Sequence, residues 1–165
     1  MATLENLKEA FAGESQANRK YLAFARKAEA EGYPMIAKLF RAAAEAETVH
    51  AHAHLRAMGG VKGTADNLQA AIDGEAYEFK TMYPGFLAAA QAEGHEAAVV
   101  SFRFALAVEK IHHALYESAA ASFKGGKDLP DESIHICPVC GNTVLGDAPD
   151  KCPICGVPKN KWVAV

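Results

Sequence analysis

Apolar residues recur three or four positions apart along most of the chain, which is the spacing of an amphipathic helix. Glycine and proline interrupt this pattern at a few points, and the breaks predict four helices, at about residues 3–31, 34–58, 64–93 and 95–123. Thr3 and Thr64 are the expected N-caps, Pro34 suits a first turn, and Pro84 is expected to kink the third helix. Long helices with short connections pack as antiparallel neighbours, so the pattern predicts an all-α four-helix bundle.

Each apolar stripe carries an acidic or imidazole side chain near its middle. Burying one unpaired carboxylate costs several kcal/mol, so a set of them needs compensating cations. Residues three apart on a helix project to the same side, and a Glu-x-x-His pair can therefore offer an oxygen and a nitrogen to one metal. The candidate ligands are Glu14 in the first helix, Glu47 and His50 in the second, Glu75 and Glu78 in the third, and Glu109 and His112 in the fourth.

These candidate ligands repeat along the sequence. Glu14, Glu47 and His50 recur as Glu75, Glu109 and His112 at an offset of 61–62 residues. Two helical hairpins related by a pseudo-twofold axis between two metals would produce this repeat, and ferritin-like di-iron and di-manganese proteins use such ligands. Oxygen-rich sites with one imidazole per metal suit iron or manganese better than zinc. The alternative is a set of ordinary surface residues, which two matching pairs on apolar stripes argue against.

The last part of the chain has a different composition, rich in proline, glycine and cysteine. It contains the pairs Cys137-Pro-Val-Cys140 and Cys152-Pro-Ile-Cys155, with eleven residues between them. This spacing predicts a tetrahedral four-sulfur metal site. A module at 133–165 is too small to fold on an apolar core alone, so it needs that metal. Spacing alone slightly favours zinc, whereas a neighbouring redox-active carboxylate site favours iron.

Composition and charge exclude several classes of function. The net charge of −3 gives no reason to expect nucleic acid or an anionic membrane as a partner. No apolar run is long enough to span a bilayer, and the N-terminus lacks the features of a signal peptide, so we expect a cytoplasmic protein. No Gly-rich dinucleotide fingerprint is present, so any NADH must be oxidised by a separate reductase. Of the other histidines, His52 and His113 are predicted to lie at the surface.

Together these motifs resemble the rubrerythrin family over nearly the whole chain. The resemblance rests on Gly13-Glu14, Glu47-x-x-His50, Gly74-Glu75-x-x-Glu78 followed by Met82-Tyr83-Pro84, Glu109-x-x-His112 and the two cysteine pairs. It implies that Glu47 and Glu109 bridge two irons, that Glu14 and Glu75 are terminal ligands, and that His50 and His112 each serve one iron. It further implies that Glu78 exchanges with His50 when the redox state changes, and that Tyr21 and Tyr83 line the site.

The resemblance also implies a fold and an activity. The expected fold is a ferritin-like di-iron bundle at residues 1–125 followed by a rubredoxin-like module at residues 133–165. The expected activity is that of a peroxidase that reduces hydrogen peroxide to water, with electrons arriving through a cysteine-bound iron across a head-to-tail homodimer. A ferritin-like iron oxidase or storage protein and a non-catalytic module with zinc in the cysteine site are the alternatives. The short connection Gly59–Gly63 raises the hypothesis that helical hairpins are exchanged between subunits.

The resemblance has two departures in the cysteine module, of which one is a slightly short loop between the two cysteine pairs. Asn142 follows Cys140-Gly141, where rubredoxin-like modules often carry an aromatic residue. This departure bears on the reduction potential and the identity of the metal there.

Overall fold

The computed structural model describes residues 2–165, and the chain forms two compact units. The first unit ends at Lys62 and the second spans Gly63–Val165. Each unit is built around one antiparallel pair of helices, so the ligand repeat in the sequence corresponds to a repeat of helical hairpins.

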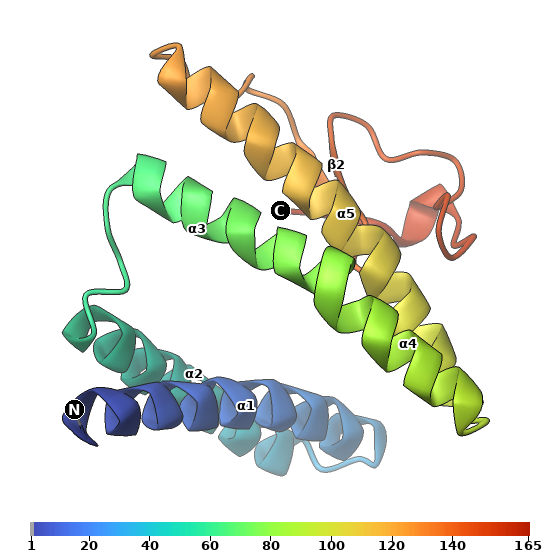
Figure 1. Ribbon diagram of the computed structural model, residues 1–165. Coiled ribbons are helices and arrows are strands. Elements are labelled where there is room, and N and C mark those ends of the chain that lie inside the picture. Colours follow the sequence, from blue (N-terminus) through green and yellow to red (C-terminus); the bar gives the residue numbers. More distant parts are fainter. Residues whose placement is uncertain (1) are drawn as a thin grey trace. The chain divides into compact units, whose positions relative to one another are not determined.

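The first unit is a hairpin of α1 (Ala2–Ala30) and α2 (Pro34–Ala57), which lie side by side in Figure 1. Gly32, at a φ of +85°, makes the tight turn between them. The helices approach closely because alanines are buried where they meet, among them Ala25, Ala28 and Ala37. Asn18 fixes their register, since its Nδ2 donates to the carbonyl oxygen of Ala44 at 2.6 Å.

The second unit begins with a long helical stretch that packs antiparallel to α5 (Glu96–Lys124). This stretch consists of α3 (Thr64–Tyr77), the π-helical turn η1 (Glu78–Met82) and α4 (Tyr83–Ala92). A small cysteine module follows, with a three-stranded antiparallel sheet in the order β2-β1-β3. Its elements are β1 (Ile134–Ile136), β2 (Thr143–Leu145), η2 (Lys159–Lys161) and β3 (Val163–Ala164).

The four predicted helical segments are confirmed, but two local predictions at their boundaries are wrong. Thr3 lies inside α1, which already begins at Ala2, so it is not an N-cap. The N-cap of α3 is Gly63, which makes Thr64 the first helical residue. Pro34 does occupy the first turn of α2.

Pro84, where the sequence predicts a kink, follows directly on an irregular turn of the helix. Pro84 has no N–H to donate to the carbonyl of Lys80, and its ring clashes with that carbonyl in a regular helix. The chain adapts by widening the preceding turn, where the Tyr83 N–H reaches back five residues to the carbonyl of Glu78. The result is a π-helical turn that ends just before Tyr83 and Pro84.

Among residues 2–165, none of the helices combines the length and the apolar character that crossing a membrane would need.

Candidate metal centres

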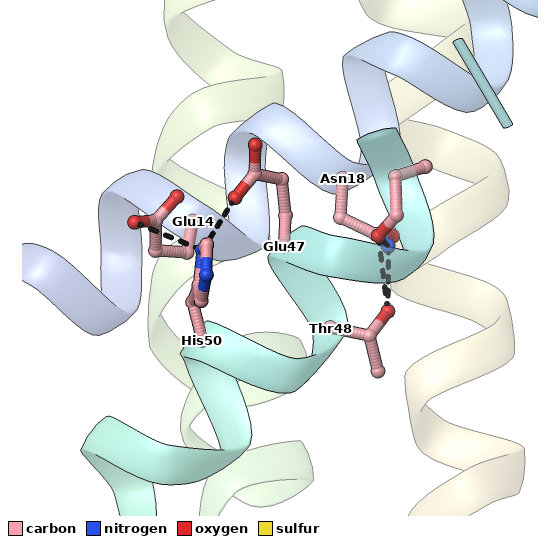
Figure 2. Close-up of polar contacts among 6 residues, drawn as sticks. Glu14, Asn18, Glu47, Thr48 and His50 are labelled. Carbon is pink, nitrogen blue, oxygen red and sulfur yellow. Dashed lines mark hydrogen bonds and ion pairs between the residues drawn. The ribbon is translucent and has the colours of Figure 1, made fainter. Parts of the chain in front are cut away.

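The first unit brings together one Glu from α1 and the Glu-x-x-His pair of α2. The Nδ1 atom of His50 lies 2.9 Å from Oε2 of Glu47 and 3.8 Å from Oε1 of Glu14. Figure 2 shows the imidazole of His50 between these two carboxylates. One ligand atom from each of the three residues lies within 4.8 Å of the others. Glu47 and His50 reach the same point because they are three residues apart on one helix.

The second unit repeats this arrangement on α3 and α5. The Nδ1 atom of His112 lies 2.8 Å from Oε2 of Glu109 and 3.9 Å from Oε1 of Glu75. The second triad is also less exposed: the side chain of His112 is 27% exposed and that of His50 is 55% exposed. We refer to the triad of Glu14, Glu47 and His50 as the first half-site, and to that of Glu75, Glu109 and His112 as the second half-site.

The repeat extends to the aromatic residues beside each half-site. Tyr21, Phe24 and Phe40 form a cluster whose ring centroids are 5.6–6.3 Å apart. Their counterparts 62 positions later form a second cluster at the same 5.6–6.3 Å separations, composed of Tyr83, Phe86 and Phe102. The two hairpins are therefore copies of one design in both their ligands and their packing.

The donor set of each half-site suits a divalent cation. In the second half-site, burial and the neighbouring carboxylate of Glu109 raise the pKa of Glu75. Two carboxylates in this position repel each other, and a cation between them and the imidazole would remove that cost. Each half-site offers two carboxylates and one imidazole nitrogen, which is a donor set for iron or manganese.

Glu78 is the ligand candidate without a counterpart in the first unit, and it begins η1. Glu75 follows Glu14 by 61 residues, whereas Tyr83 follows Tyr21 by 62, so the second hairpin has one extra residue in this stretch. A π-helical turn accommodates one extra residue in a helix, and such turns occur frequently at functional sites. Burial and the charge of Glu75 raise the pKa of Glu78. The insertion therefore places an additional carboxyl group beside the second half-site.

The raised pKa of Glu75 predicts how the stability of the metal-free protein depends on pH. Between the ordinary value of 4.5 and its raised value, Glu75 binds more protons in the folded than in the unfolded chain, so stability falls as pH rises through this window. We expect the melting temperature of metal-free protein to increase as the pH is lowered from neutral towards the ordinary value of 4.5.

Glu75→Gln should raise that melting temperature at neutral pH, reduce the gain on acidification and lower the stabilisation by added ferrous iron. Glu45→Gln, at an exposed position of α2, is the matched control and should change none of these quantities. Calorimetry of both variants with and without iron checks the prediction, and an unchanged gain on acidification in Glu75→Gln contradicts it.

The four cysteines of the second unit converge on one point. The Sγ atoms of Cys137 and Cys155 lie 3.5 Å apart, as do those of Cys140 and Cys152. These distances are too long for disulfide bonds and near the sulfur–sulfur separation of a tetrahedral site with metal–sulfur bonds of about 2.3 Å. Burial would raise the pKa of Cys152, but hydrogen bonds from the amides of Cys155 and Ile154 lower it to about 6. Cys152 thus favours thiolate, the form that binds metal, whereas burial raises the pKa of Cys140 and of Cys155 above the ordinary value.

Asn142 occupies the interior of the cysteine module, with 1% of its surface exposed. Its Nδ2 atom donates to the Sγ of Cys152 at 3.8 Å. An aromatic residue at this position would shield the site, whereas Asn142 supplies a hydrogen bond to one of the four sulfur atoms. Hydrogen bonds to such sulfur atoms tune the reduction potential of a bound iron.

The cysteine module lies against α5 of the same unit. Val108 of α5 is buried and would be 3.7 Å from a Cβ atom at Gly141. One turn further along α5, the Nε2 atom of His112 lies 3.0 Å from Oγ1 of Thr143 in β2. Thr143 could not be found from the sequence, because no periodic pattern signals a contact between residues 31 positions apart in different folding elements.

The remaining predicted residues have different surroundings. Tyr83 lies near the acidic cluster. Burial and the charges of Glu78, Glu109 and Glu75 therefore raise its pKa. Tyr21 packs in the first aromatic cluster. His52 is exposed, as predicted. The surface prediction for His113 is wrong, since its side chain is only 14% exposed and its ring meets the ring of Phe79 edge-on.

Comparisons with known proteins match both the helical part and the cysteine module of the chain. The family model for rubrerythrin matches residues 5–120, and the model for the rubrerythrin rubredoxin-like domain matches residues 135–162. The chain is 40% identical to rubrerythrin-2 of Clostridium acetobutylicum, over 98% of this chain and 96% of that protein. It is also 40% identical to nigerythrin of Nitratidesulfovibrio vulgaris, over 99% of this chain and 86% of nigerythrin.

A solved structure of nigerythrin in the fully reduced, all-ferrous state matches with a TM-score of 0.60 and 37% identity, covering 99% of this chain and 86% of that one. These matches confirm the predicted fold class, a ferritin-like helical domain with a C-terminal rubredoxin-like module. The matched ranges lie inside the domains proposed at residues 1–125 and 133–165.

Proposed function

The chain belongs to the rubrerythrin family, and on this premise we propose that it is a non-haem di-iron peroxidase that reduces hydrogen peroxide to water. The family combines a di-iron site of carboxylates and histidines with a four-cysteine site, and this chain has residues for both. The observation that carries the proposal is the geometric repeat of the two half-sites, each with a histidine Nδ1 atom facing two carboxylates.

The role proposed for each ligand is the one that the resemblance to the family implies. Glu47 and Glu109, the partners closest to the two histidines, would bridge two irons, with Glu14 and Glu75 as terminal ligands. His50 and His112 would each bind one iron. Bound ferrous ions would supply the two electrons that cleave one peroxide. Structures of nigerythrin described as mixed-valent, partially reduced and all-ferrous support a redox role for iron in that relative.

Glu78 and the two site tyrosines would supply protons and hydrogen bonds, and Glu78 would also act as a metal ligand. Reduction of one peroxide to water consumes two protons, and the raised pKa values of Glu78 and Tyr83 favour their protonated forms. We propose that Tyr83 and its counterpart Tyr21 donate hydrogen bonds within the site. Glu78 would replace His50 as a ligand when the metals become ferric, because an anion stabilises the higher charge better than a neutral imidazole does.

The cysteine site would deliver electrons to the second half-site of its own chain. A cavity of about 280 Å³ in the second unit is lined by Glu109, His112 and Cys140, so a thiolate ligand and two carboxylate-site ligands share one space. The resemblance implied delivery across a head-to-tail dimer, whereas here the module packs on its own α5. A separate NADH-oxidising reductase would supply the electrons. Free cysteines are typical of the cytoplasm, where we place the protein.

We further propose that two copies of the chain complete each di-iron site by exchanging hairpins. A ferritin-like bundle needs one long crossover connection between its two hairpins. The 24 residues of α2 span about 36 Å, which such a crossover must cover. Residues 58–63 connect α2 to α3, and six residues extend only about 20 Å. The connection is too short, so the first half-site of one chain would pair with the second half-site of a partner.

Complementation between inactive variants tests this exchange. His50→Ala and His112→Ala should each be inactive alone. Co-expressed chains should regain activity, because a mixed dimer with exchanged hairpins combines the intact first half-site of one chain with the intact second half-site of the other. Peroxidase assays on dimers isolated through two different affinity tags measure this. If the mixed dimers stay inactive while retaining the iron of the cysteine site, exchange is wrong.

The activity itself is tested by mixing anaerobically reduced protein with hydrogen peroxide or with dioxygen in a stopped-flow spectrophotometer. We expect peroxide to restore the visible ferric-thiolate absorption faster than dioxygen does. Protein from iron-supplied cells that lacks ferric-thiolate bands would contradict the electron-transfer role and favour zinc in the cysteine site. Faster reoxidation by dioxygen, with deposition of ferric iron, would favour the iron oxidase instead.

A further inference from the structure

His112 is held from both sides, by two different parts of the second unit. Its Nδ1 atom faces Glu109 of its own helix at 2.8 Å. Its Nε2 atom lies 3.0 Å from the hydroxyl oxygen of Thr143, which belongs to the cysteine module. The imidazole therefore connects the second half-site directly to the module that binds the other metal.

The hydrogen bonds of Thr143 determine which nitrogen of His112 carries the proton. Oγ1 of Thr143 is also 3.1 Å from the carbonyl oxygen of Gly141, which can only accept. The single hydroxyl proton is donated to that carbonyl, so the hydroxyl oxygen accepts from the Nε2–H of His112. A neutral imidazole protonated at Nε2 has its lone pair at Nδ1, on the side of Glu109 and Glu75. Thr143 thus selects the tautomer that can bind a metal in the second half-site.

The folded cysteine module is what places Thr143 beside α5. Thr143 of β2 pairs with Ile136 of β1. It lies two residues after Gly141, and Gly141 packs on Val108 of α5. The carbonyl of Asn142 accepts from the amide of Cys137, so the loop that carries Thr143 is tied to the metal-binding turn. A module of this size does not fold without its metal. Thr143 therefore reaches His112 only when the cysteines hold a metal.

We infer that Thr143 is a positioning residue that couples the two metal sites, so that metal in the cysteine site raises the affinity of the carboxylate site for ferrous iron. The coupling is reciprocal, and iron in the carboxylate site equally favours a folded, metal-bound cysteine module. Partners that orient a metal-binding histidine typically contribute 10–100-fold to metal affinity, which sets the expected size. The inference rests on the proposed carboxylate metal site but needs no peroxidase activity.

The test uses the full chain with zinc as a redox-inert metal. One equivalent of Zn²⁺ occupies the cysteine site, since thiolates bind zinc more strongly than carboxylates do. Anaerobic competition with a ferrous chelator then gives the affinity of the carboxylate site in the zinc-loaded chain and, for comparison, in a zinc-free Cys152→Ser chain, whose cysteine site cannot take up the added iron. We expect zinc to tighten ferrous binding by about 10-fold or more in the unmodified chain. The Nε2–H signal of His112 should also be visible by nitrogen-15 NMR in the zinc-loaded, iron-free protein.

Three variants separate positioning from packing. Thr143→Val keeps the shape and the strand preference but removes the hydroxyl, so it should lose the effect of zinc and the Nε2–H signal. Thr143→Ser restores the hydroxyl and should recover both. Ser133→Ala removes another hydroxyl of the same module, one that donates to Gly146, and should behave like the unmodified chain.

The inference is wrong if Thr143→Val keeps the effect of zinc, if Thr143→Ser loses it equally, or if zinc changes nothing in the unmodified chain. Because zinc does not change its oxidation state, these outcomes do not depend on turnover of peroxide. A protein that shows the coupling but does not reduce peroxide would refute the proposed function and support the coupling.

Discussion

Replacing His112 by alanine should abolish peroxide-driven reoxidation of the reduced protein. His112 provides the single imidazole of the second half-site, and its Nδ1 atom lies within 2.8 Å of Glu109. Removing it leaves two carboxylates, Glu75 and Glu109, to share one metal, and the second half-site loses its connection to Thr143. We expect the reoxidation rate to fall by more than about 100-fold, beyond the range for residues that only orient a ligand. Glu109→Ala should have the same effect because it removes the carboxylate that is proposed to bridge the two irons.

Two comparisons make this result interpretable. His50→Ala is the symmetric change in the first half-site and should be as severe, whereas His52→Ala, on the exposed side of the same helix, should leave the rate unchanged. Stopped-flow absorbance gives the rates, and metal analysis gives the iron content of each variant. Unchanged reoxidation in His112→Ala or Glu109→Ala, with loss of carboxylate-site iron confirmed, would refute the assignment of these ligands.

Replacing Cys152 by serine should remove the electron entry site. Cys152 is 3% exposed, and its Sγ atom lies 3.5 Å from that of Cys140 and accepts from Asn142. A serine cannot replace a thiolate with a pKa of about 6, so the cysteine module should lose its metal and unfold. We expect the visible ferric-thiolate absorption to disappear and turnover driven by a reductase to stop.

Cys152→Ser should still reduce peroxide in a single turnover. At saturating ferrous iron, pre-reduced carboxylate-site iron should still consume peroxide once, because its six triad ligands are intact. Lys161→Ala, at an exposed position of η2 in the same module, serves as the control and should preserve both the absorption and turnover. Normal reductase-driven turnover in Cys152→Ser would show that electrons do not enter through the cysteine site.

The half-sites could be predicted from the sequence because their ligands obey helical geometry. Glu47 with His50 and Glu109 with His112 are three apart on one helix, so spacing alone brings each pair together. The repeat then associated Glu14 and Glu75 with these pairs, and both lie within 4.8 Å of their partners in the structure. The cysteine site was predictable for a similar reason, since two short turns present four sulfurs to one point.

The π-helical turn and the contact of Thr143 could not be predicted, because neither follows the regular spacing of residues in an α-helix. The uniqueness of Glu78 was visible in the repeat, but the π-helical turn was not, because helical spacing assumes 3.6 residues per turn. That turn also brings Phe79 against His113, which explains why a residue predicted at the surface is largely covered. Thr143 reaches His112 only through the packing of the cysteine module on α5, a tertiary contact.

Hairpin exchange changes how the family's electron path applies to this chain. If each di-iron site combines hairpins from two copies, the cysteine module that serves it belongs to the chain that contributes Glu75, Glu109 and His112. The dimer would then be required to assemble the site rather than to carry electrons between subunits. The short connection at residues 58–63 supports the exchange of hairpins. The contact between His112 and Thr143 supports electron delivery within the chain that contributes both residues.

Anomalous scattering tests the central claim most directly. Crystals of protein from iron-supplied cells, measured above and below the iron absorption edge, should show three iron peaks per chain. Two peaks should lie among Glu14, Glu47, His50, Glu75, Glu109 and His112, and the third among Cys137, Cys140, Cys152 and Cys155. Absence of a peak beside the carboxylates, or peaks that appear only above the zinc edge, would contradict a di-iron peroxidase.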